Sequence, residues 1–189
     1  MKIAVCCAMN NNRSMEAHKI LLESNVKVDS YGTSPQIKIP GETIDTPNIY
    51  QFGITYFEIY NDLFVKNEKF YERIGILKML ERNMKIKESP ESYFSKQKNY
   101  DLVITAEEKC FVSIYDYHRS IRGDNKLYLV NFDIKDTIND ASSGALEIKD
   151  FVKYCIINKD PYEYRIANAL EKIHVKYGKN NLFTVMDCN

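Results

Sequence analysis

The apolar positions of this chain alternate between short continuous runs and stretches with helical spacing. Residues 3–7 and 102–104 are continuous apolar runs, which are typical of strands buried on both faces of a sheet. Residues 26–30 alternate apolar and polar positions and predict a second strand, and residues 127–132 predict another. The pattern therefore predicts a sheet whose central strands are fully buried.

Segments with helical spacing follow the predicted strands. The first helix is expected over residues 13–24. Thr105 and Glu108 predict a capping box that opens a helix ending at Arg122-Gly123. Two further helices are expected, one over about 145–155 and one that begins at Asp160-Pro161 and ends near Tyr177-Gly178.

The region between the second and third predicted strands differs from the rest of the chain. Residues 33–49 contain Pro35, Pro40, Gly41 and Pro47, which predict an irregular loop of functional length. Residues 50–85 then carry two stretches of helical spacing. We interpret these as a pair of helices inserted between the first βαβ half and the remainder of the fold.

Strands that alternate with helices predict the fold class. It is a three-layer α/β fold with a doubly wound parallel sheet, formed by residues 1–189 as a single domain. Such sheets bind ligands beyond the carboxyl ends of their strands. The segments expected there are residues 7–13, the chain from residue 105 onward, and residues 131–140.

Composition limits the classes of partner. Lys plus Arg and Asp plus Glu both number 26, so the formal net charge is zero and no global field favours direct binding to nucleic acid or to an anionic membrane. Five cysteines without a Cys-x2-Cys pair predict reduced thiols in a cytosolic or nuclear compartment. No apolar run is long enough to predict a membrane span.

Candidate chemistry lies in the Cys-x5-Arg segment that joins the first strand to the first helix. Five intervening residues let successive backbone N–H groups converge on one oxyanion, next to the positive end of the helix. The planar guanidinium of Arg13 matches two phosphate oxygens, and Cys7 beneath them is the expected nucleophile. The predicted phosphate-binding residues are Ala8, Met9, Asn10, Asn11, Asn12, Arg13 and Ser14.

Two questions about this segment stay open at the level of spacing. Cys7 can instead be a buried cysteine followed by an ordinary surface turn. Ser14 is expected to support the Cys7 sulfur through a hydrogen bond. Cys6 should point to the opposite layer of the sheet as a structural thiol, although a resolving thiol that protects Cys7 from over-oxidation is the alternative.

A phosphocysteine mechanism also needs a carboxylic acid to protonate the leaving oxygen. Three candidates follow a predicted strand, at the edge of the sheet where the nucleophile is expected: Asp133, Asp136 and Asp140. Spacing alone does not choose among them.

The three histidines and the cysteines do not cluster in the sequence, so no metal and no other cofactor is expected. His18 is expected to brace the loop or to pack beside it, rather than to act as an acid or base. His118 and His174 are interpreted as ordinary helix residues.

The chain resembles a known family. The segment NRSMEAH at residues 12–18 is similar to the signature of the eukaryotic RNA polymerase II C-terminal-domain phosphatases of the cysteine-dependent, symplekin-associated type. Further similar stretches follow in the same order, and they are YGT (31–33), IPG (39–41), PNIY (47–50), YNDL (60–63), GIL (75–77), MLERN (79–83), EE (107–108) and NFDIKD (131–136).

The resemblance implies a fold like that of low-molecular-weight tyrosine phosphatases, with an added helical pair. It implies hydrolysis of phosphoserine before a cis-proline in the polymerase heptad repeats, with Cys7 as nucleophile and Arg13 as phosphate binder. It also implies that Asp136 is the general acid and Asp133 a supporting neighbour. The residues that it places around the substrate proline are Lys38, Pro40 and Met79, within and beyond the loop from Lys38 to Pro47.

The implied partners are the phosphorylated C-terminal domain of RNA polymerase II and a symplekin-like scaffold of mRNA 3′-end processing. The implied location is the nucleus, with the cytoplasm as the alternative. Three other functions are weighed against this one. Two are enzymes, a low-molecular-weight tyrosine phosphatase and a related arsenate reductase. The third is a non-catalytic scaffold that binds phosphopeptides.

Overall fold

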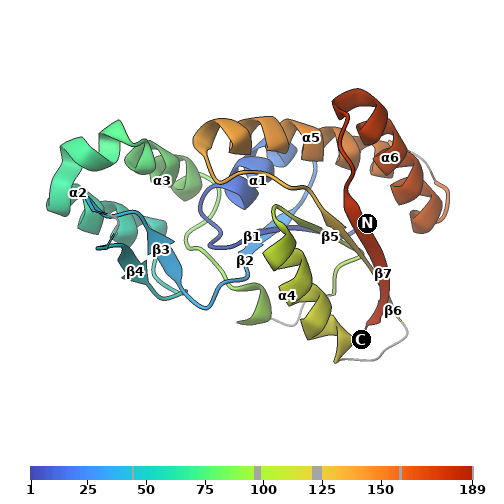
Figure 1. The fold of residues 1–189 in the computed structure, drawn as a ribbon, viewed down its shortest axis with the longest axis horizontal. Coiled ribbons are helices and arrows are strands. Elements are labelled where there is room, and N and C mark those ends of the chain that lie inside the picture. The colour runs from blue at the N-terminus through green and yellow to red at the C-terminus, as the bar shows by residue number, and fades with distance from the viewer. Residues whose placement is uncertain (44, 96–98, 121–124, 158, 189) are drawn as a thin grey trace.

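A mostly parallel sheet forms the centre of the protein (Figure 1). The structure is a computed structural model that describes residues 1–43, 45–95, 99–120, 125–157 and 159–188. Within these residues the sheet has five strands in the order β2-β1-β5-β6-β7. Their bounds are β1 (Ile3–Cys7), β2 (Asp29–Gly32), β5 (Leu102–Thr105), β6 (Asn125–Asn131) and β7 (Leu182–Cys188).

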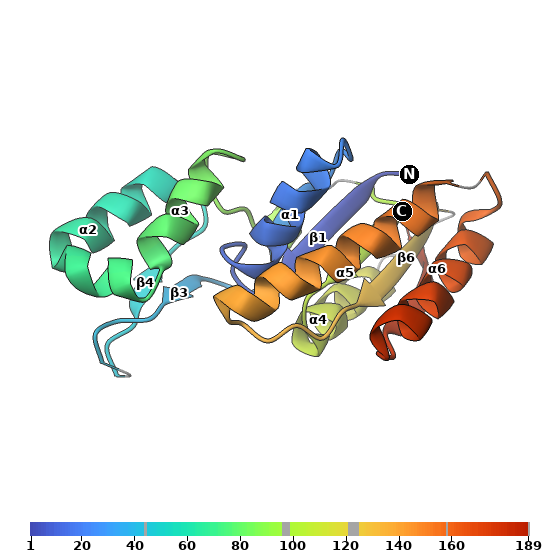
Figure 2. The ribbon, with the colours of Figure 1, turned by 90° about the horizontal axis from the view of Figure 1, so that it is seen from above.

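Helices cover both faces of this sheet, as Figures 1 and 2 show. One face is covered by α1 (Arg13–Glu23), α5 (Ile138–Ile157) and α6 (Tyr162–Tyr177), and the other by α4 (Glu108–Arg119) and a 3-10 helix, Tyr93–Ser95. Successive side chains of β1 point to opposite faces, so Val5 and Cys7 pack in the first layer, whereas Ala4 and Cys6 pack in the second.

The inserted segment forms a separate hydrophobic cluster beside the sheet (Figure 2). It consists of β3 (Ile37–Ile39), β4 (Asn48–Tyr50), α2 (Tyr56–Arg73) and α3 (Ile76–Met84). Met15 of α1 is fully buried in this cluster and so joins it to the body of the protein. The predicted helical pair is therefore present, but residues 33–49 are not wholly irregular, because β3 and β4 pair antiparallel within them.

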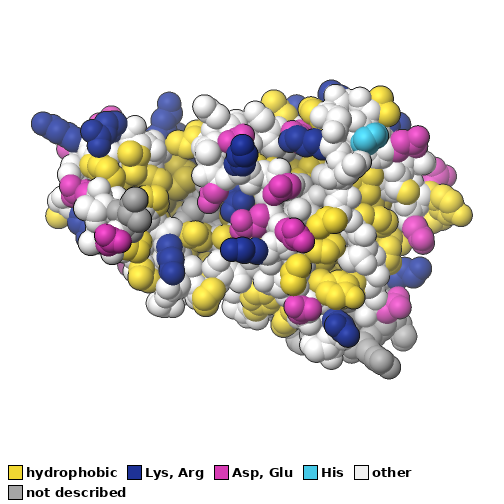
Figure 3. All heavy atoms as spheres, in the orientation of Figure 1, with side chains coloured by type: hydrophobic (Ala, Val, Ile, Leu, Met, Phe, Trp, Pro, Cys, Tyr) yellow, Lys and Arg dark blue, Asp and Glu magenta, His cyan; other side chains and the backbone are white. Residues whose placement is uncertain are grey.

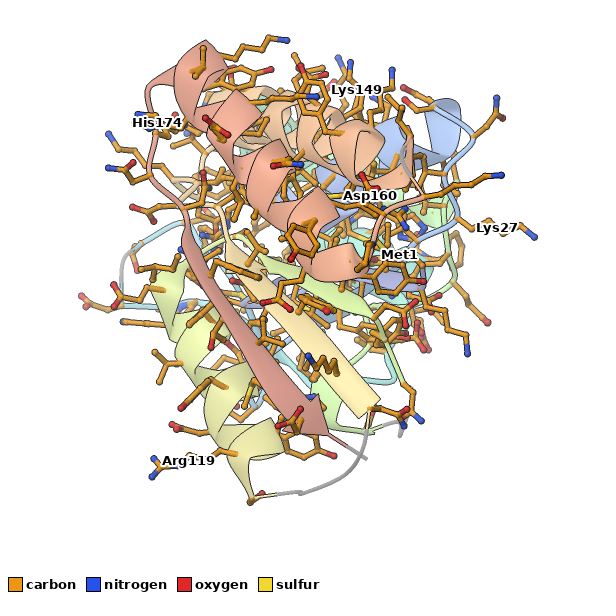
Figure 4. All side chains as sticks on the ribbon, turned by 90° about the vertical axis from the view of Figure 1, so that its right-hand side faces the viewer. Met1, Lys27, Arg119, Lys149, Asp160 and His174 are labelled. Carbon is orange, nitrogen blue, oxygen red and sulfur yellow. The ribbon has the colours of Figure 1, made fainter. Side chains whose placement is uncertain are left out.

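The predicted parallel sheet needs one correction, because β7 runs antiparallel to β6. Two successive helices, α5 and α6, separate these strands, and they pack against each other. The first helix leads away from the edge of the sheet at which β6 ends, and the second leads back to it. β7 therefore starts at that edge and runs in the opposite direction to β6. Figure 4 shows β7 at the edge of the sheet, with α4 on one side and α6 on the other.

The capping box predicted at Thr105 and Glu108 is wrong. Thr105 ends β5, and its hydroxyl donates to Asn131 Oδ1 at 2.8 Å instead of capping α4. The capping box that does form belongs to α2, where the Glu58 N–H donates to Thr55 Oγ1 at 3.1 Å. The predicted stop at residues 122–123 lies outside the described residues.

No helix in the described part of the chain combines the length and the apolar character that crossing a bilayer requires.

The packing of α5 on the sheet gives a stability prediction. Phe151 is fully buried, and its ring centroid lies 5.3 Å from that of Phe132. Phe151→Ala is expected to lower the free energy of unfolding by about 3–5 kcal/mol, because it leaves a cavity between helix and sheet. Urea unfolding measures the change. On the same helix, Ile157 is 72% exposed, and Ile157→Ala should change the stability by no more than about 0.5 kcal/mol. Equal losses for both variants would contradict this packing.

Candidate active site

The loop between β1 and α1 turns sharply at Asn10 beyond the carboxyl end of β1. Asn10 has a φ of 55°, in the left-handed region that asparagine enters more readily than most residues. Its fully buried side chain donates to Ser14 Oγ and to Ser30 Oγ, each at 3.1 Å. It also accepts the Glu91 N–H at 3.0 Å. These contacts on three sides fix the turn.

Cys7 lies at the start of this loop, and Cys6 beside it faces the other way. The Cys7 sulfur is 3.1 Å from Ser14 Oγ, at the amino-terminal end of α1. Cys6 is fully buried in the opposite layer of the sheet, where burial first and then the neighbouring thiols Cys110 and Cys7 raise its pKa. The prediction that the two adjacent cysteines face opposite layers is confirmed. Cys6 therefore behaves as a buried thiol, and only Cys7 of the pair faces the loop.

Arg13 is almost completely buried and is held by carboxylates. Its Nη1 donates to Glu107 Oε2 at 3.2 Å, and its Nη2 lies 3.2 Å from Glu107 Oε1, which is a two-pronged ion pair. Nε lies 3.3 Å from Asp136 Oδ1. Burial lowers the pKa of Arg13, but the negative charges that Cys7, Asp136 and Glu107 carry when ionised outweigh it and raise that pKa overall. The guanidinium is thus fixed both in charge and in orientation.

Glu107 was not singled out as a site residue by the sequence analysis. The signal that could have found it is its place two residues beyond β5, at the edge of the sheet where the loop lies.

Of the three candidate acids, the structure brings only Asp136 to the loop. Besides its contact with Arg13, Asp136 accepts from Asn12 Nδ2 at 3.0 Å, and its side chain is 49% exposed. Asp133 is exposed. Asp140 accepts from the Thr137 hydroxyl at 2.6 Å and donates its own N–H to that oxygen at 3.0 Å, so Thr137 caps the start of α5 and Asp140 is held there.

A groove of about 680 Å³ leads to Cys7 between the insertion and the body of the protein. Apolar side chains gather in this region in Figure 3. Lys38, Pro40 and Met79 all line the groove, as does Asp136. A second cavity, of about 770 Å³, lies near Met1 and Tyr100 at the amino ends of the strands, so of these two spaces the groove is the one that reaches the loop. The other apolar residues that line the groove are Met9, Ile39, Phe70, Ile74, Ile76 and Ile138.

The histidines lie outside the groove. His18 Nδ1 is 2.9 Å from Ser30 Oγ, the hydroxyl that also binds Asn10, so His18 braces the loop from behind. His118 Nε2 is 2.9 Å from the Tyr93 hydroxyl. His174 lies on α6 at the end of the molecule shown in Figure 4. Among the described residues, no group of three or more His, Cys, Asp or Glu side chains could hold a metal ion.

The fold and the site together define a class of protein. It is a three-layer α/β protein in which a cysteine and an arginine flank one turned loop at the carboxyl edge of a parallel sheet. A sharply turned loop, a helix start and a buried cation suit a bound oxyanion.

Comparison with known proteins identifies the family. Residues 1–187 match the family described as "Ssu72-like protein", and the chain belongs to it. The chain is 42% identical to the RNA polymerase II C-terminal domain phosphatase ssu72 of Schizosaccharomyces pombe, over 86% of this chain and 84% of that protein. It is 37% identical to the human phosphatase of the same name, over 98% of this chain and 96% of the human protein.

A solved structure supports the same assignment. The Drosophila melanogaster Ssu72 bound to Symplekin and to a cis peptidomimetic of a CTD phosphoserine peptide matches with a TM-score of 0.94 and 31% identity, over 99% of this chain and 98% of that chain. The family resemblance inferred from residues 12–18 is confirmed, and so is the predicted three-layer α/β fold class, apart from the antiparallel β7.

The bracing by His18 predicts a pH dependence of stability. Burial, and then the positive charge of Lys87, lowers the pKa of His18 to about 4 from an ordinary value of 6.5. Between these values the unfolded chain binds a proton that the folded chain does not, so stability falls as the pH falls through that window. His18→Gln should remove up to about 1.4 kcal/mol per pH unit from that slope, as measured by urea unfolding between about pH 7 and pH 4.5. An unchanged slope would show that His18 does not titrate in this way.

Proposed function

We propose that this protein removes phosphate from Ser-Pro sites in the heptad repeats of the RNA polymerase II C-terminal domain, through a phosphocysteine intermediate. The observation that carries the proposal is the convergence of Cys7, Ser14 and Arg13 on one loop, with Arg13 clamped by Glu107. The phosphatase activity of the yeast and human relatives, which match most of the chain, points the same way.

In the first step the Cys7 thiolate attacks phosphorus in line with the leaving serine oxygen. The loop amides and Arg13 take up the charge that spreads over the three equatorial oxygens. Asp136 stands across the loop at the mouth of the groove, and its carboxylic acid gives a proton to the leaving oxygen. The S–P bond forms as the P–O bond breaks.

In the second step water attacks the phosphocysteine, and Asp136 now accepts a proton from that water. The S–P bond breaks and returns the Cys7 thiolate, which the Ser14 hydroxyl stabilises by donating a hydrogen bond across 3.1 Å. We propose Asp133 as a supporting neighbour of Asp136 on the same loop, and residues 8–14 as the phosphate-binding set.

The groove supports a peptide substrate that carries a proline. Its wall is largely apolar, and Lys38, Pro40 and Met79 stand beside the loop. An open apolar groove suits an extended Ser-Pro segment better than it suits a single aromatic ring. We therefore favour phosphoserine over the phosphotyrosine of the alternative enzyme class. The Drosophila relative binds such a peptide together with Symplekin, and we propose a symplekin-like partner and a nuclear role for this chain as well.

Replacement of the nucleophile tests the proposal. Cys7→Ser is expected to abolish hydrolysis of a phosphoserine-proline heptad peptide, because the hydroxyl is a far weaker nucleophile at neutral pH. Peptide binding, measured by fluorescence anisotropy, should stay within about threefold of wild type, since the groove and Arg13 are unchanged. Cys6→Ser serves as the matched control and should retain turnover. Unchanged hydrolysis in Cys7→Ser would dispose of the catalytic proposal, and a preference for phosphotyrosine peptides would favour the alternative enzyme.

The acid is tested by a pair of variants. Asp136→Asn should lower kcat by about 10²–10⁴-fold and remove the alkaline limb of the pH–rate profile, where a general acid loses its proton. Asp133→Asn should keep that limb. If the two variants behave in the opposite way, Asp133 is the acid. A leaving group of low pKa, such as p-nitrophenol, should restore much of the rate in the Asp136→Asn variant.

A further inference from the structure

The carbonyl groups of the phosphate-binding loop are held from outside, by two different parts of the protein. On the side of the body, the Thr33 N–H lies 3.0 Å from both Cys7 O and Ala8 O, and the Ser34 N–H donates to Ala8 O at 2.9 Å. This approach requires Gly32, where an added Cβ would stand 2.9 Å from Ala8 O. The amino-terminal half of the loop is thus tied to the end of β2.

The carboxyl-terminal half is held by the inserted helices. Arg82 Nη2 donates to Asn11 O at 2.7 Å and to Asn12 O at 3.3 Å, and Asn83 Nδ2 donates to Asn11 O at 2.8 Å. The Tyr56 hydroxyl of α2 donates to the preceding carbonyl of the loop, that of Asn10. Both ribbon views place α3 on the side of the insertion that faces α1.

Planarity of the peptide bond links these outer contacts to the anion site. In a trans peptide the carbonyl of one residue and the N–H of the next point in opposite directions. Donors that hold Asn10 O, Asn11 O and Asn12 O on the outside therefore turn the N–H groups of Asn11, Asn12 and Arg13 toward the centre of the loop. A cationic donor on the oxygen also polarises the same peptide, which makes its N–H a stronger donor to an oxyanion.

The donors themselves are fixed. Arg82 Nη1 forms an ion pair with Glu16 Oε2 at 2.6 Å, and its Nε and Nη2 donate to Asn83 Oδ1 at 3.0 and 2.8 Å. Asn83 is fully buried, and so is Tyr56. A lysine at position 82 could keep the charge near Glu16, but its single ammonium group could not replace the fork that serves Asn11 O, Asn83 and Glu16 together.

We propose that Arg82 and Asn83 are positioning residues for the reaction, and that the inserted helical pair orients the loop amides in addition to forming a wall of the groove. This inference rests on the proposed phosphatase function, and it extends that function to residues that do not touch the substrate. It also makes the insertion and the body of the protein one functional unit, because Tyr56, Arg82 and Asn83 reach the loop carbonyls only when the insertion is in place.

Arg82→Lys tests the inference. We expect kcat for a phosphoserine-proline peptide to fall by about 10–100-fold, with less than about a threefold change in KM, because the amides are aimed at charge that develops in the transition state. The inhibition constant of vanadate, which mimics the five-coordinate transition state, should rise by a similar factor. Asn83→Ala should show the same pattern more weakly.

The matched control lies in the same insertion. Tyr50→Phe removes a hydrogen bond of 2.6 Å to Asp62 without touching the loop, and it should leave kcat and vanadate inhibition unchanged. Thermal unfolding is measured for every variant. If Arg82→Lys is not folded at the assay temperature, Asn83→Ala is assayed in its place. A folded variant with wild-type kcat and wild-type vanadate inhibition would overturn the inference.

A second measurement keeps the inference separate from the proposed function. Anionic iodoacetate must enter the loop to alkylate Cys7, whereas neutral iodoacetamide gains little from it, so the ratio of the two rates reports how well the loop binds an anion. We expect the rate with iodoacetate divided by the rate with iodoacetamide to fall at least about fivefold in Arg82→Lys. If the wild-type protein hydrolyses no phosphopeptide, the proposed function fails while this ratio still tests the loop. An unchanged ratio would overturn the positioning role.

Discussion

The structure depends on one constraint: the carbonyl groups of the turned loop between β1 and α1 need donors from other elements. Asn10 supplies the left-handed turn, Thr33 and Ser34 after β2 bind the first carbonyls, and the insertion binds the last ones. The sheet, the glycine at position 32 and the helical pair all serve this arrangement.

Charge balance around Arg13 is the second requirement of the site. A guanidinium buried to this extent needs partners, and Glu107 and Asp136 supply them from two different strand ends. Asp136 is the more exposed of the two and lines the groove, while Glu107 holds the fork of the guanidinium. The contact with Arg13 therefore also holds Asp136, the proposed acid, at the groove.

Features that depend on neighbouring residues were predicted well. The first strand, the loop and the first helix lie where the apolar run and the Cys-x5-Arg spacing placed them. Features that depend on distant contacts were not. Thr105 has the spacing of a cap, but its hydroxyl binds Asn131 on the next strand, and β7 runs antiparallel because two helices intervene before it. The hairpin of β3 and β4 was interpreted as loop, since each strand is only three residues long.

The sequence by itself determined the fold class and the family, and it predicted the chemistry of the loop, because a strand–loop–helix unit is encoded by residues that are adjacent in the chain. Only the tertiary structure decided which aspartate reaches Arg13, that Glu107 clamps it, and that Arg82 and Asn83 reach the loop from about seventy residues away. Those contacts join side chains from separate elements, and their distances depend on how the helices pack on the sheet, which no local pattern encodes.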